Sequence, residues 1–480
     1  MDLNYKKLKL KSGLEIHFQL DLGKLFCRCP SILKESKPNF KIKRRLNSVT
    51  SETGEKDLVA NYEISKNKYA IYEVYEDTNC LVELDESPAE KVNQEALKTT
   101  LQIAKLLNCE IVDEILVMRK QVINYSNPSG FQRTALIARN GFITTSKGKV
   151  NIENIYLEED AARKISENKD YVTYRLDRLG IPLIEIVTAP DIKTPEQAKE
   201  VAEYLGMIVK STGKKRIGIG TIRQDVNLSI KGLNRIELKG FQDLKSMPKV
   251  INIEIKRQLD LLKKGKKINS EVRNVLKDNT STYLRPMPSS SRLYPETDVK
   301  TIEINKKLLK SIKIPELILE KTQKLKKLGI QESIAKELIK QNINLKDYNY
   351  KLDKREIATI LIEIPKDIKK KEKLNYSFKK EDFDLVLGLL DKKQISKSAI
   401  KEILIEIAKG KKVDISKYEL IDEKLIDKEI KRLVKVNENL IKEKKERSIK
   451  ILMGELMKKF KGKTDNSLLF KKLKKEIDLF

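Results

Sequence analysis

The sequence changes character near residue 300, and this change limits the possible folds more than any other feature. Up to about Pro295 the chain holds most of its 19 glycines, many β-branched runs and most turn signals. These features are typical of mixed α+β domains. After Tyr294, leucine, isoleucine, lysine and glutamate dominate, as expected of helices. We therefore predict an α+β domain at 1–300, followed by all-α regions.

Hydrophobic periodicity predicts individual elements of the first region. Residues 68–75 alternate like a strand. Residues 93–107, 195–205 and 246–264 have helical spacing, and Thr194 and Pro195 suit the start of the second helix. Two runs at 133–138 and 141–145 flank Arg139-Asn140 and predict a hairpin. The run that ends at Leu157 predicts a strand, and residues 161–165 predict a helix. Breaks between the later helices are expected near Pro315, 342–349, Pro365 and Gly410.

The charge balance favours a polyanionic partner. The formal net charge is +29, and 35% of the residues are charged, compared with about 25% in typical globular proteins. A general bias toward lysine explains the excess equally well, and the clusters at 369–371 and 409–412 suit solvated loops or phosphate contacts. Residues 1–10 lack the apolar core of a signal peptide, and no apolar run is long enough for a membrane span. We expect a cytoplasmic protein.

Two segments place carboxylates where strands should lie. His17, the chain's single histidine, would share one face of a strand with Glu15, and together they form two plausible metal ligands. The alternative is a buried histidine with ordinary hydrogen bonds. Glu185 lies inside the apolar run PLIEIV (182–187), where a charge is costly unless it is paired or bound to metal. An ion pair with Arg175 or Arg178 is the competing explanation.

Further polar groups follow at strand-like spacing. In the segment 220–230, Arg223 and Asp225 share a face, and in 235–239 Glu237 and Lys239 do. The two segments resemble a hairpin, so Asp225 and Glu237 could lie together. The acidic run Glu158-Glu159-Asp160 is a further candidate, although acids also suit a helix N-terminus.

Such a set of acids and one imidazole suits Mg²⁺, and nearby cations suit the oxygens of a triphosphate. No phosphate-binding loop of the form G-x-x-x-x-G-K-[ST] occurs, and one histidine makes a serine triad improbable. The residues therefore favour metal-assisted phosphoryl transfer.

The cysteines give a weaker indication. Cys27 and Cys29 form a C-x-C pair, whereas Cys80 and Cys109 stand alone. A structural zinc site needs four ligands, and no second pair supplies them. Free or buried thiols in a reducing compartment are therefore the favoured interpretation.

Taken together, these segments resemble the B/E subunits of tRNA-dependent amidotransferases, and most closely the archaeal E-type (GatE) branch. The resembling segments include LKSGLEIHFQLDLGKLFCRCPS (10–31), CLVELDESP (80–88), SGFQRTALIA (129–138), LEEDAARKI (157–165), DRLGIPLIEIVTAPDI (177–192), GIGTIRQDVN (218–227), RIELKGFQDL (235–244), LRPMPSSSRLYPETDV (284–299) and MGELMKKFKGKTD (453–465). E-type proteins carry an inserted domain resembling part of an aspartyl-tRNA synthetase. Here only residues 264–283 stand at its place, so the insert is expected to be missing.

The resemblance implies a ligase that forms a carbon–nitrogen bond. It would convert glutamate esterified to tRNA(Gln) into glutamine, by phosphorylating the γ-carboxylate with ATP and Mg²⁺ and letting ammonia displace the phosphate. Ammonia would come from an asparaginase-like partner, GatD, in a heterodimer or heterotetramer. A cradle-shaped catalytic domain of antiparallel sheets (1–300), a helical domain (301–400) and a helical YqeY-like tail domain that binds tRNA (401–480) are implied.

The resemblance also implies roles for residues. His17, Glu185 and one of Glu158 and Glu159 would bind the catalytic Mg²⁺, and Glu159 is favoured because it shares a strand face with Leu157. A second metal or ammonia-channel group would comprise Glu15, Asp225 and Glu237. We infer from their charge that Arg223 and Lys239 stabilise phosphate or acyl phosphate.

Two alternative functions remain: one is an enzyme subunit with a different partner, and the other is a protein without catalytic activity. A B-type subunit would share the phosphorylating site and work with a glutamine-using amidase. A non-catalytic RNA-binding protein would not be expected to retain all of the acidic segments.

Overall fold

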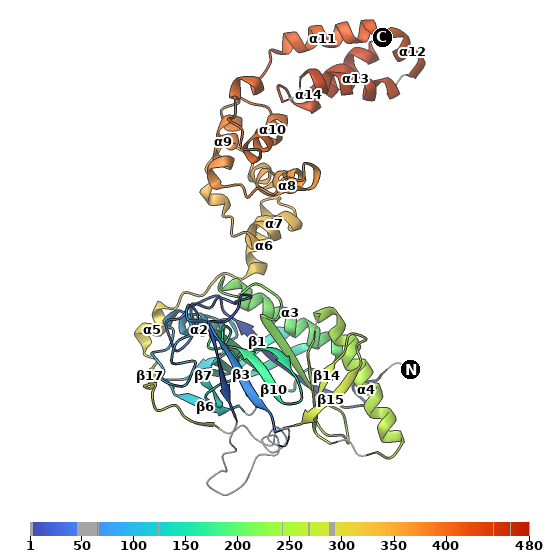
Figure 1. Cartoon of the computed structure of the whole chain (residues 1–480). Helices are drawn as coiled ribbons and strands as arrows, with labels where there is room; N and C mark the ends of the chain where they lie inside the picture. The colour runs from blue at the N-terminus through green and yellow to red at the C-terminus, as the bar shows by residue number, and fades with distance from the viewer. Residues whose placement is uncertain are drawn as a thin grey trace. The chain divides into compact units, whose positions relative to one another are not determined.

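The computed structural model describes residues 3–45, 65, 67–122, 124–241, 243–266, 269–287, 293–444, 446–460 and 462–479. The chain forms two compact units, Met1–Leu317 and Ile318–Phe480 (Figure 1). The first unit combines sheets and helices and the second is helical, which confirms the predicted α+β fold with an all-α continuation.

The first unit is built around one large sheet. Its strand order is β15-β14-β13-β12-β1-β11-β8-β7-β6-β16, and β4 pairs with β7. Neighbouring strands are antiparallel except for β13 and β14. The strands span Lys11–Gln19 (β1), Glu110–Ile111 (β4), Val117–Gln121 (β6), Phe131–Thr145 (β7), Gly148–Glu159 (β8), Pro182–Thr188 (β11), Ile222–Ser229 (β12), Ile236–Lys239 (β13), Glu271–Val275 (β14), Ser281–Pro286 (β15) and Leu293–Pro295 (β16).

Two smaller sheets complete the strands of this unit. One has the order β2-β3-β10-β9, from Phe40–Arg44, Tyr69–Val74, Tyr171–Arg175 and Arg163–Glu167. In it β3 and β10 run parallel, and the rings of Tyr72 and Tyr174 stack. The other pairs β17 (Ile302–Glu303) with β5 (Glu114–Ile115).

Helices cover the apolar face of the large sheet. They are α2 (Gln94–Leu106), α3 (Pro195–Ser211) and α4 (Met247–Lys263), and residues of the short helices η1 (Leu244–Ser246) and α5 (Lys306–Ser311) pack against the same cluster. Leu14, Ile16 and Phe18 of β1 belong to the same buried cluster as residues of these helices. Burying each such side chain contributes about 2 kcal/mol. Because strand side chains alternate, Glu15 and His17 lie on the opposite face of β1.

The described residues of the second unit form two hydrophobic clusters. One extends from Ile330 to Tyr418 and the other from Ile426 to Leu473. The helices are α6 (Ile318–Lys327), α7 (Glu332–Lys340), α8 (Lys354–Lys371), α9 (Lys380–Asp391), α10 (Lys397–Ala408), α11 (Glu423–Val436), α12 (Glu438–Lys444), α13 (Glu446–Lys459) and α14 (Asn466–Asp478), with η2 (Leu345–Asp347) and η3 (Ile415–Tyr418) between them. Among the described residues, no helix is long and apolar enough to cross a membrane.

Several predicted elements are confirmed. β3, α2 and α4 lie where the periodicity placed them. Thr194 caps α3 by accepting a hydrogen bond from the Gln197 N–H, and the helix continues beyond the predicted range to Ser211.

The predicted hairpin at Arg139-Asn140 is wrong, because residues 131–145 form one strand. β7 remains paired with β8 through this point, from Arg139 opposite Asn154 to Gly141 opposite Ile152. Gly141 is needed there for a different reason. A Cβ atom at Gly141 would lie 2.1 Å from Cys109 Sγ and 2.6 Å from the Leu107 carbonyl oxygen, so a side chain would collide with the end of α2.

Two further predictions are corrected. Residues 163–167 form strand β9 and not a helix, because Arg163 lies opposite Arg175 of β10 and forms an ion pair with Asp177. Pro365 does not end a helix but lies inside α8. That helix buries Ile357, Leu361 and Ile368 along one side, and this burial offsets the hydrogen bond that proline removes.

Candidate functional site

The polar face of the large sheet carries the predicted site residues on adjacent strands. β1 lies between β11 and β12, and His17 is opposite both Glu185 and Arg223. Glu15 is opposite Asp225. Directly opposite residues point to the same face of a sheet, so the strand pairing gathers these five side chains on one surface.

The first group on this surface, called the histidine group below, consists of His17, Glu158 and Glu185. One ligand atom from each lies within 4.8 Å of the others. His17 Nε2 is 3.5 Å from Glu185 Oε2. Lys120 of β6 joins them, with its Nζ 3.2 Å from Glu158 Oε1 and 3.5 Å from Glu185 Oε2. The sequence analysis missed Lys120.

Burial and mutual repulsion alter the protonation of this group. Burial and the charge of Glu185 raise the pKa of Glu158 to about 7. Burial also opposes the charge of Glu185, yet His17 and Lys120 lower the pKa of that carboxyl on balance. Burial disfavours a charged His17, but the two carboxylates raise its pKa overall. Near neutral pH the two carboxyls and the imidazole therefore hold protons that a binding cation would displace, as is usual for metal ligands.

Two side chains of β7 hold Glu158 in place. Thr134 Oγ1 donates a hydrogen bond of 3.0 Å to Glu158 Oε1, and Gln132 Nε2 donates one of 2.9 Å to Glu158 Oε2. Both residues were also missed by the sequence analysis. Their alternate positions at the start of β7 were the available signal, but only the pairing of β7 with β8 shows what they face.

The second group, called the triacid group below, consists of Glu15, Asp225 and Glu237. The predicted hairpin of β12 and β13 is confirmed, with Val226 opposite Leu238. Lys239 Nζ lies 2.5 Å from both Asp225 Oδ2 and Glu237 Oε1. Burial works against the charge of this ammonium, but the two carboxylates raise its pKa on balance. The triacid group thus already holds a cation of its own.

Glu15 connects the two groups. Its Oε1 accepts a hydrogen bond of 2.8 Å from Asn227 Nδ2. Burial, followed by the charges of Glu237 and Glu185, raises the pKa of Glu15. This carboxyl therefore takes up a proton more readily than an exposed glutamate does.

Arg223 lies beside His17 on the same face, and the carboxylate of Asp160 holds its guanidinium group. Its Nη2 donates a hydrogen bond of 2.9 Å to Asp160 Oδ1. Asp160 is fully buried, and Arg178 Nε lies 3.7 Å from its Oδ2. Arg178 is therefore the partner of Asp160 and not of Glu185, and Arg175 pairs with Glu73. The competing explanation for Glu185, a buried ion pair, is therefore wrong in its partner: Glu185 pairs with Lys120 at 3.5 Å and with neither arginine.

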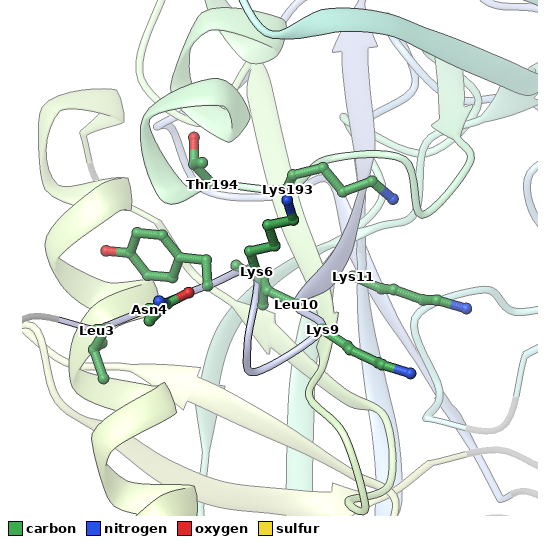
Figure 2. Close-up of a pocket in the computed structure, with 9 residues that line it drawn as sticks. Leu3, Asn4, Lys6, Lys9, Leu10, Lys11, Lys193 and Thr194 are labelled. Carbon is green, nitrogen blue, oxygen red and sulfur yellow. The ribbon is translucent and has the colours of Figure 1, made fainter.

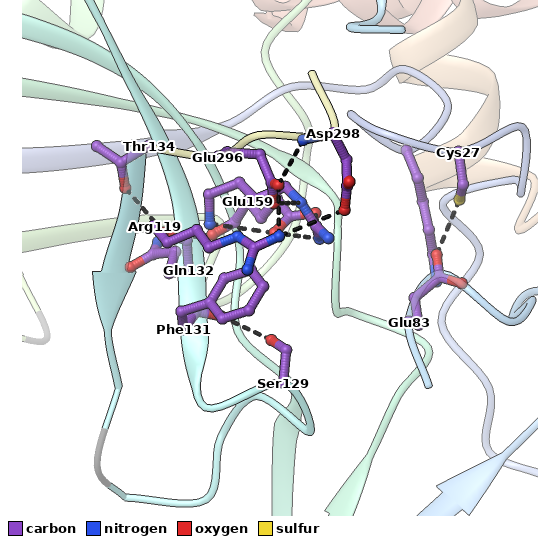
Figure 3. A network of polar contacts seen from close by, with 12 residues as sticks. Cys27, Glu83, Arg119, Ser129, Phe131, Gln132, Thr134, Glu159, Glu296 and Asp298 are labelled. Atoms are coloured by element: carbon purple, nitrogen blue, oxygen red, sulfur yellow. Dashed lines mark hydrogen bonds and ion pairs between the residues drawn. The ribbon is translucent and has the colours of Figure 1, made fainter. Parts of the chain in front are cut away.

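Glu159 lies outside the histidine group, so the preference for it over Glu158 has to be corrected. Its carboxylate faces Arg133, whose Nη1 is 3.3 Å away, and Arg133 Nε also donates to Glu296. Figure 3 shows Glu159 and Glu296 converging with Arg119 in this network. The physical reason is the alternation of β8. Glu159 shares with Leu157 the face of β8 that packs on the core. Glu158 points to the opposite, polar face, together with Glu185.

The cysteines also come together more than the sequence indicated. Cys27, Cys29, Cys80 and Glu83 each offer a ligand atom within 4.8 Å of the others. Cys80 and Glu83 are therefore the two ligands that the C-x-C pair lacked, and such a set could hold zinc. Without an ion, Cys27 Sγ donates to Glu83 Oε1 at 2.9 Å (Figure 3), and Lys24 Nζ lies 3.0 Å from the same oxygen.

A cavity of about 960 Å³ lies at the beginning of β1. Figure 2 shows its lysine-rich wall, which includes Lys6, Lys9, Lys11 and Lys193. No member of the histidine or triacid group lines it. The polar face, and not this cavity, carries the groups suited to chemistry.

The histidine group fits a divalent cation on structural grounds. Among the described residues, buried His17 Nδ1 has no hydrogen-bond partner, and buried Glu185 Oε2 makes ion-pair contacts of 3.5 Å with His17 Nε2 and Lys120 Nζ but no hydrogen bond. Unsatisfied buried polar atoms are costly, and a bound ion would satisfy such atoms. Carboxylate oxygens with a neighbouring imidazole suit Mg²⁺ that retains water or phosphate ligands.

Comparisons with known proteins identify the family of this chain. The model of the GatB/GatE catalytic domain matches residues 10–310, and a model described as the GatB domain matches residues 330–477. Three similar proteins carry the name of the E-type subunit of glutamyl-tRNA(Gln) amidotransferase. The Methanocaldococcus jannaschii protein is 35% identical over 637 residues, with 99% of this chain and 100% of the relative covered. Those of Archaeoglobus fulgidus and Saccharolobus solfataricus are each 33% identical, with 99% of both chains covered.

The first of these alignments is longer than this chain of 480 residues, so the relative has residues without a counterpart here. This difference agrees with the expected absence of the inserted domain, because α4 is followed directly by β14 and β15. The chain belongs to the GatB/GatE family, and lacks the insert of its E-type members.

Proposed function

We propose that this chain is the tRNA-dependent subunit that amidates glutamate already attached to tRNA(Gln). The observation that carries the proposal is the polar face of β1, where a metal-type ligand group, an arginine and a lysine-bound acidic group lie side by side. The names of the relatives supply the substrate. ATP and Mg²⁺ are the proposed cosubstrate and cofactor.

The first step activates a poor electrophile. The γ-carboxylate of the tRNA-bound glutamate attacks the γ-phosphorus of ATP, so an acyl phosphate forms and ADP leaves. Mg²⁺ bound by His17, Glu158 and Glu185 would neutralise charge on the phosphate oxygens. Arg223 and Lys120 border this group and would hold the remaining phosphate charge. The buried Asp160 keeps the Arg223 guanidinium oriented.

The second step requires neutral ammonia. A carboxylate of the triacid group, with Glu15 as the best placed because its pKa is raised, would accept a proton from ammonium. Ammonia then attacks the acyl carbon, the carbon–oxygen bond to phosphate breaks, and inorganic phosphate leaves. Lys239 is bound to Asp225 and Glu237, so it would set their positions. Its ammonium would also offer positive charge to the phosphate.

The helical regions would hold the RNA, and an asparaginase-like partner of the GatD type would supply the ammonia. Proposed domain limits of 301–400 and 401–480 place residue 401 inside α10, which belongs to the first helical cluster with α8 and α9. A truncation to test tRNA binding is therefore better made at Asp422, the N-cap of α11. We expect this truncation to weaken tRNA binding. Unchanged affinity would remove α11–α14 from the tRNA-binding surface.

The decisive experiment uses the purified chain with glutamyl-tRNA(Gln), ATP, Mg²⁺ and ammonium chloride. Free ammonium replaces the ammonia-producing partner. We expect glutaminyl-tRNA and ADP to form together, and neither without Mg²⁺. Absence of both products, also after addition of GatD, would overturn the proposal.

A further inference from the structure

The loop between α3 and β12 carries two isoleucines whose side chains are almost completely exposed to solvent. Ile217 has an exposed fraction of 92% and Ile219 of 106%. No other large apolar side chain among the described residues exceeds 76%. Fully exposed neighbouring apolar side chains on a monomer commonly mark a binding surface.

The base of this loop is held firmly by β1. The Asp21 N–H donates to the Lys214 carbonyl at 2.8 Å, and the Arg216 N–H donates to the Gln19 carbonyl at 2.9 Å. The Gln19 N–H then donates to the Thr221 carbonyl at 3.0 Å. These bonds extend the pairing of β1 and β12, so the sheet itself presents the two isoleucines.

Glycines on both sides shape the tip. Gly218 and Gly220 have φ angles of +137° and +77°, which residues with a side chain rarely adopt. Thr221 Oγ1 donates to the Gly218 carbonyl at 2.9 Å and closes the turn. Added side chains would be strained at both glycines, whereas Ile217 and Ile219 support no other part of the structure.

The loop lies close in sequence to Arg223 on the polar face of the sheet. Three residues lie between Ile219 and Arg223, so their Cα atoms are at most about 14 Å apart. Arg223 is opposite His17 in the sheet. A ligand lying on the loop could thus reach the histidine group.

The charge between the loop and the histidine group indicates what this ligand carries. Arg223 and Arg178 both contact one carboxylate, Asp160, so two guanidinium groups lie close together on this path. Lys215 donates to Thr221 Oγ1 at 3.3 Å and has no carboxylate within ion-pair distance among the described residues. Burial and the charge of Lys210 lower its pKa. This order of groups matches a nucleoside triphosphate. The apolar tip suits the base, the cations suit the triphosphate, and the metal ligands suit its terminal phosphate.

We propose that Ile217 and Ile219 form the apolar platform on which the adenine of ATP lies, while its triphosphate passes Arg223 toward the histidine group. This inference rests on the proposed function. The terminal adenosine of tRNA would fit the platform equally by size. However, the ester that joins it to glutamate carries no phosphate and would not need the intervening cations.

The test measures binding without turnover. We would determine the affinities of ATP and of tripolyphosphate, which lacks the base, in the presence of Mg²⁺ for the wild type and for a variant with Ile217→Ser and Ile219→Ser. The variant should bind ATP about tenfold more weakly, equivalent to about 1.4 kcal/mol, and tripolyphosphate unchanged. Ile217→Phe with Ile219→Phe should retain or increase ATP affinity, because aromatic rings stack on bases. Ile314→Ser, at another exposed isoleucine, is the matched control.

Each other result has a defined meaning. Equal weakening of ATP and tripolyphosphate, or no weakening, overturns the base platform. Weaker binding of uncharged tRNA with unchanged ATP affinity assigns the loop to the RNA end and also overturns it. A wild-type chain that binds no ATP contradicts the proposed function itself. A wild type that binds ATP and amidates while the serine variant binds ATP equally well contradicts only this inference.

Discussion

The histidine group and the triacid group lie side by side on one sheet face and have similar ligand spacing, but they differ in what already occupies them. In the triacid group the ammonium of Lys239 lies 2.5 Å from two of the three acids. In the histidine group Lys120 is more distant, and two buried ligand atoms have no hydrogen-bond partner in the described part of the chain. Spacing alone therefore does not define a metal site, because an ammonium that already bridges two of the ligand oxygens must be displaced before a metal ion can bind them.

The difference assigns separate tasks to the two groups. A group with unsatisfied atoms and a carboxyl that titrates near neutral pH exchanges its protons for a metal ion. A group in which an internal lysine bridges two of the three carboxylates binds a divalent cation less readily, because the ammonium must be displaced, but its carboxylates remain available for proton transfer. The following predictions test this division.

The largest effect is expected from Glu185→Gln. The substitution keeps the shape and removes the charge that faces both His17 and Lys120. Mg²⁺ binding should be lost, and tRNA-dependent ADP formation should fall about a thousandfold, as when a key electrostatic group is removed from an active site. Glu237→Gln should cost only about tenfold, because Asp225 still binds Lys239. ADP assays with both variants check this, and equal losses would contradict the division between the groups.

A smaller effect, on stability, is expected from Lys239→Met. It leaves the buried carboxylates of Asp225 and Glu237 without their cation. The free energy of unfolding should fall by about 3 kcal/mol, the scale of a broken buried ion pair. Added Mg²⁺ should restore part of the loss, because the emptied group now gains from a cation.

Denaturant unfolding with and without Mg²⁺ measures this effect. Lys256→Met is the matched control, since Lys256 is exposed on α4. If Mg²⁺ stabilises the Lys239 variant no more than the wild type, the lysine is not what keeps a metal out of the triacid group.

The polar face could largely be predicted from the sequence, because a strand has a fixed period of two residues. Once β1 and the β12–β13 hairpin were identified, the common orientation of Glu15 with His17 and of Arg223 with Asp225 followed from alternation. The same rule explains the error at Glu159, which had the correct neighbours on β8 but was assigned to the wrong face. A local pattern shows which residues share a face, and only burial shows which face that is.

Contacts between distant segments could not be predicted in this way. Lys120, Gln132 and Thr134 reach Glu158 through the pairing of β6, β7 and β8, which no local period encodes. Cys80 and Glu83 join the C-x-C pair through loops separated by about fifty residues of sequence. The single long strand β7 was hidden for a similar reason, since Gly141 serves packing against α2 and not a turn.

The next effect concerns pH and the histidine group alone. Glu158 has a pKa of about 7, and the pKa of His17 is also raised. Both groups bind a metal only when they are deprotonated, so acid must weaken Mg²⁺ binding. Affinity should fall at least tenfold per pH unit below pH 7, and more steeply where both groups are protonated. Mg²⁺ titrations across this range check the prediction, and Glu158→Gln should reduce the slope by one proton, because His17 still titrates. A wild-type slope equal to that of the Glu158→Gln variant would mean that Glu158 is no ligand.

The smallest effect is expected from Thr134→Val, which tests whether orientation matters as well as charge. The variant removes the hydroxyl that donates to Glu158 Oε1, while Gln132 still holds Oε2. Losing one such hydrogen bond should lower Mg²⁺ affinity about fivefold, with little change in unfolding. Thr144→Val, at an exposed position of the same strand, provides the control. The cost of Lys239→Met in the free energy of unfolding should be the same with and without Thr134→Val. If Thr134→Val changed that cost as strongly as it changed Mg²⁺ binding, the two groups would form a single coupled network, and their division into separate tasks would fail.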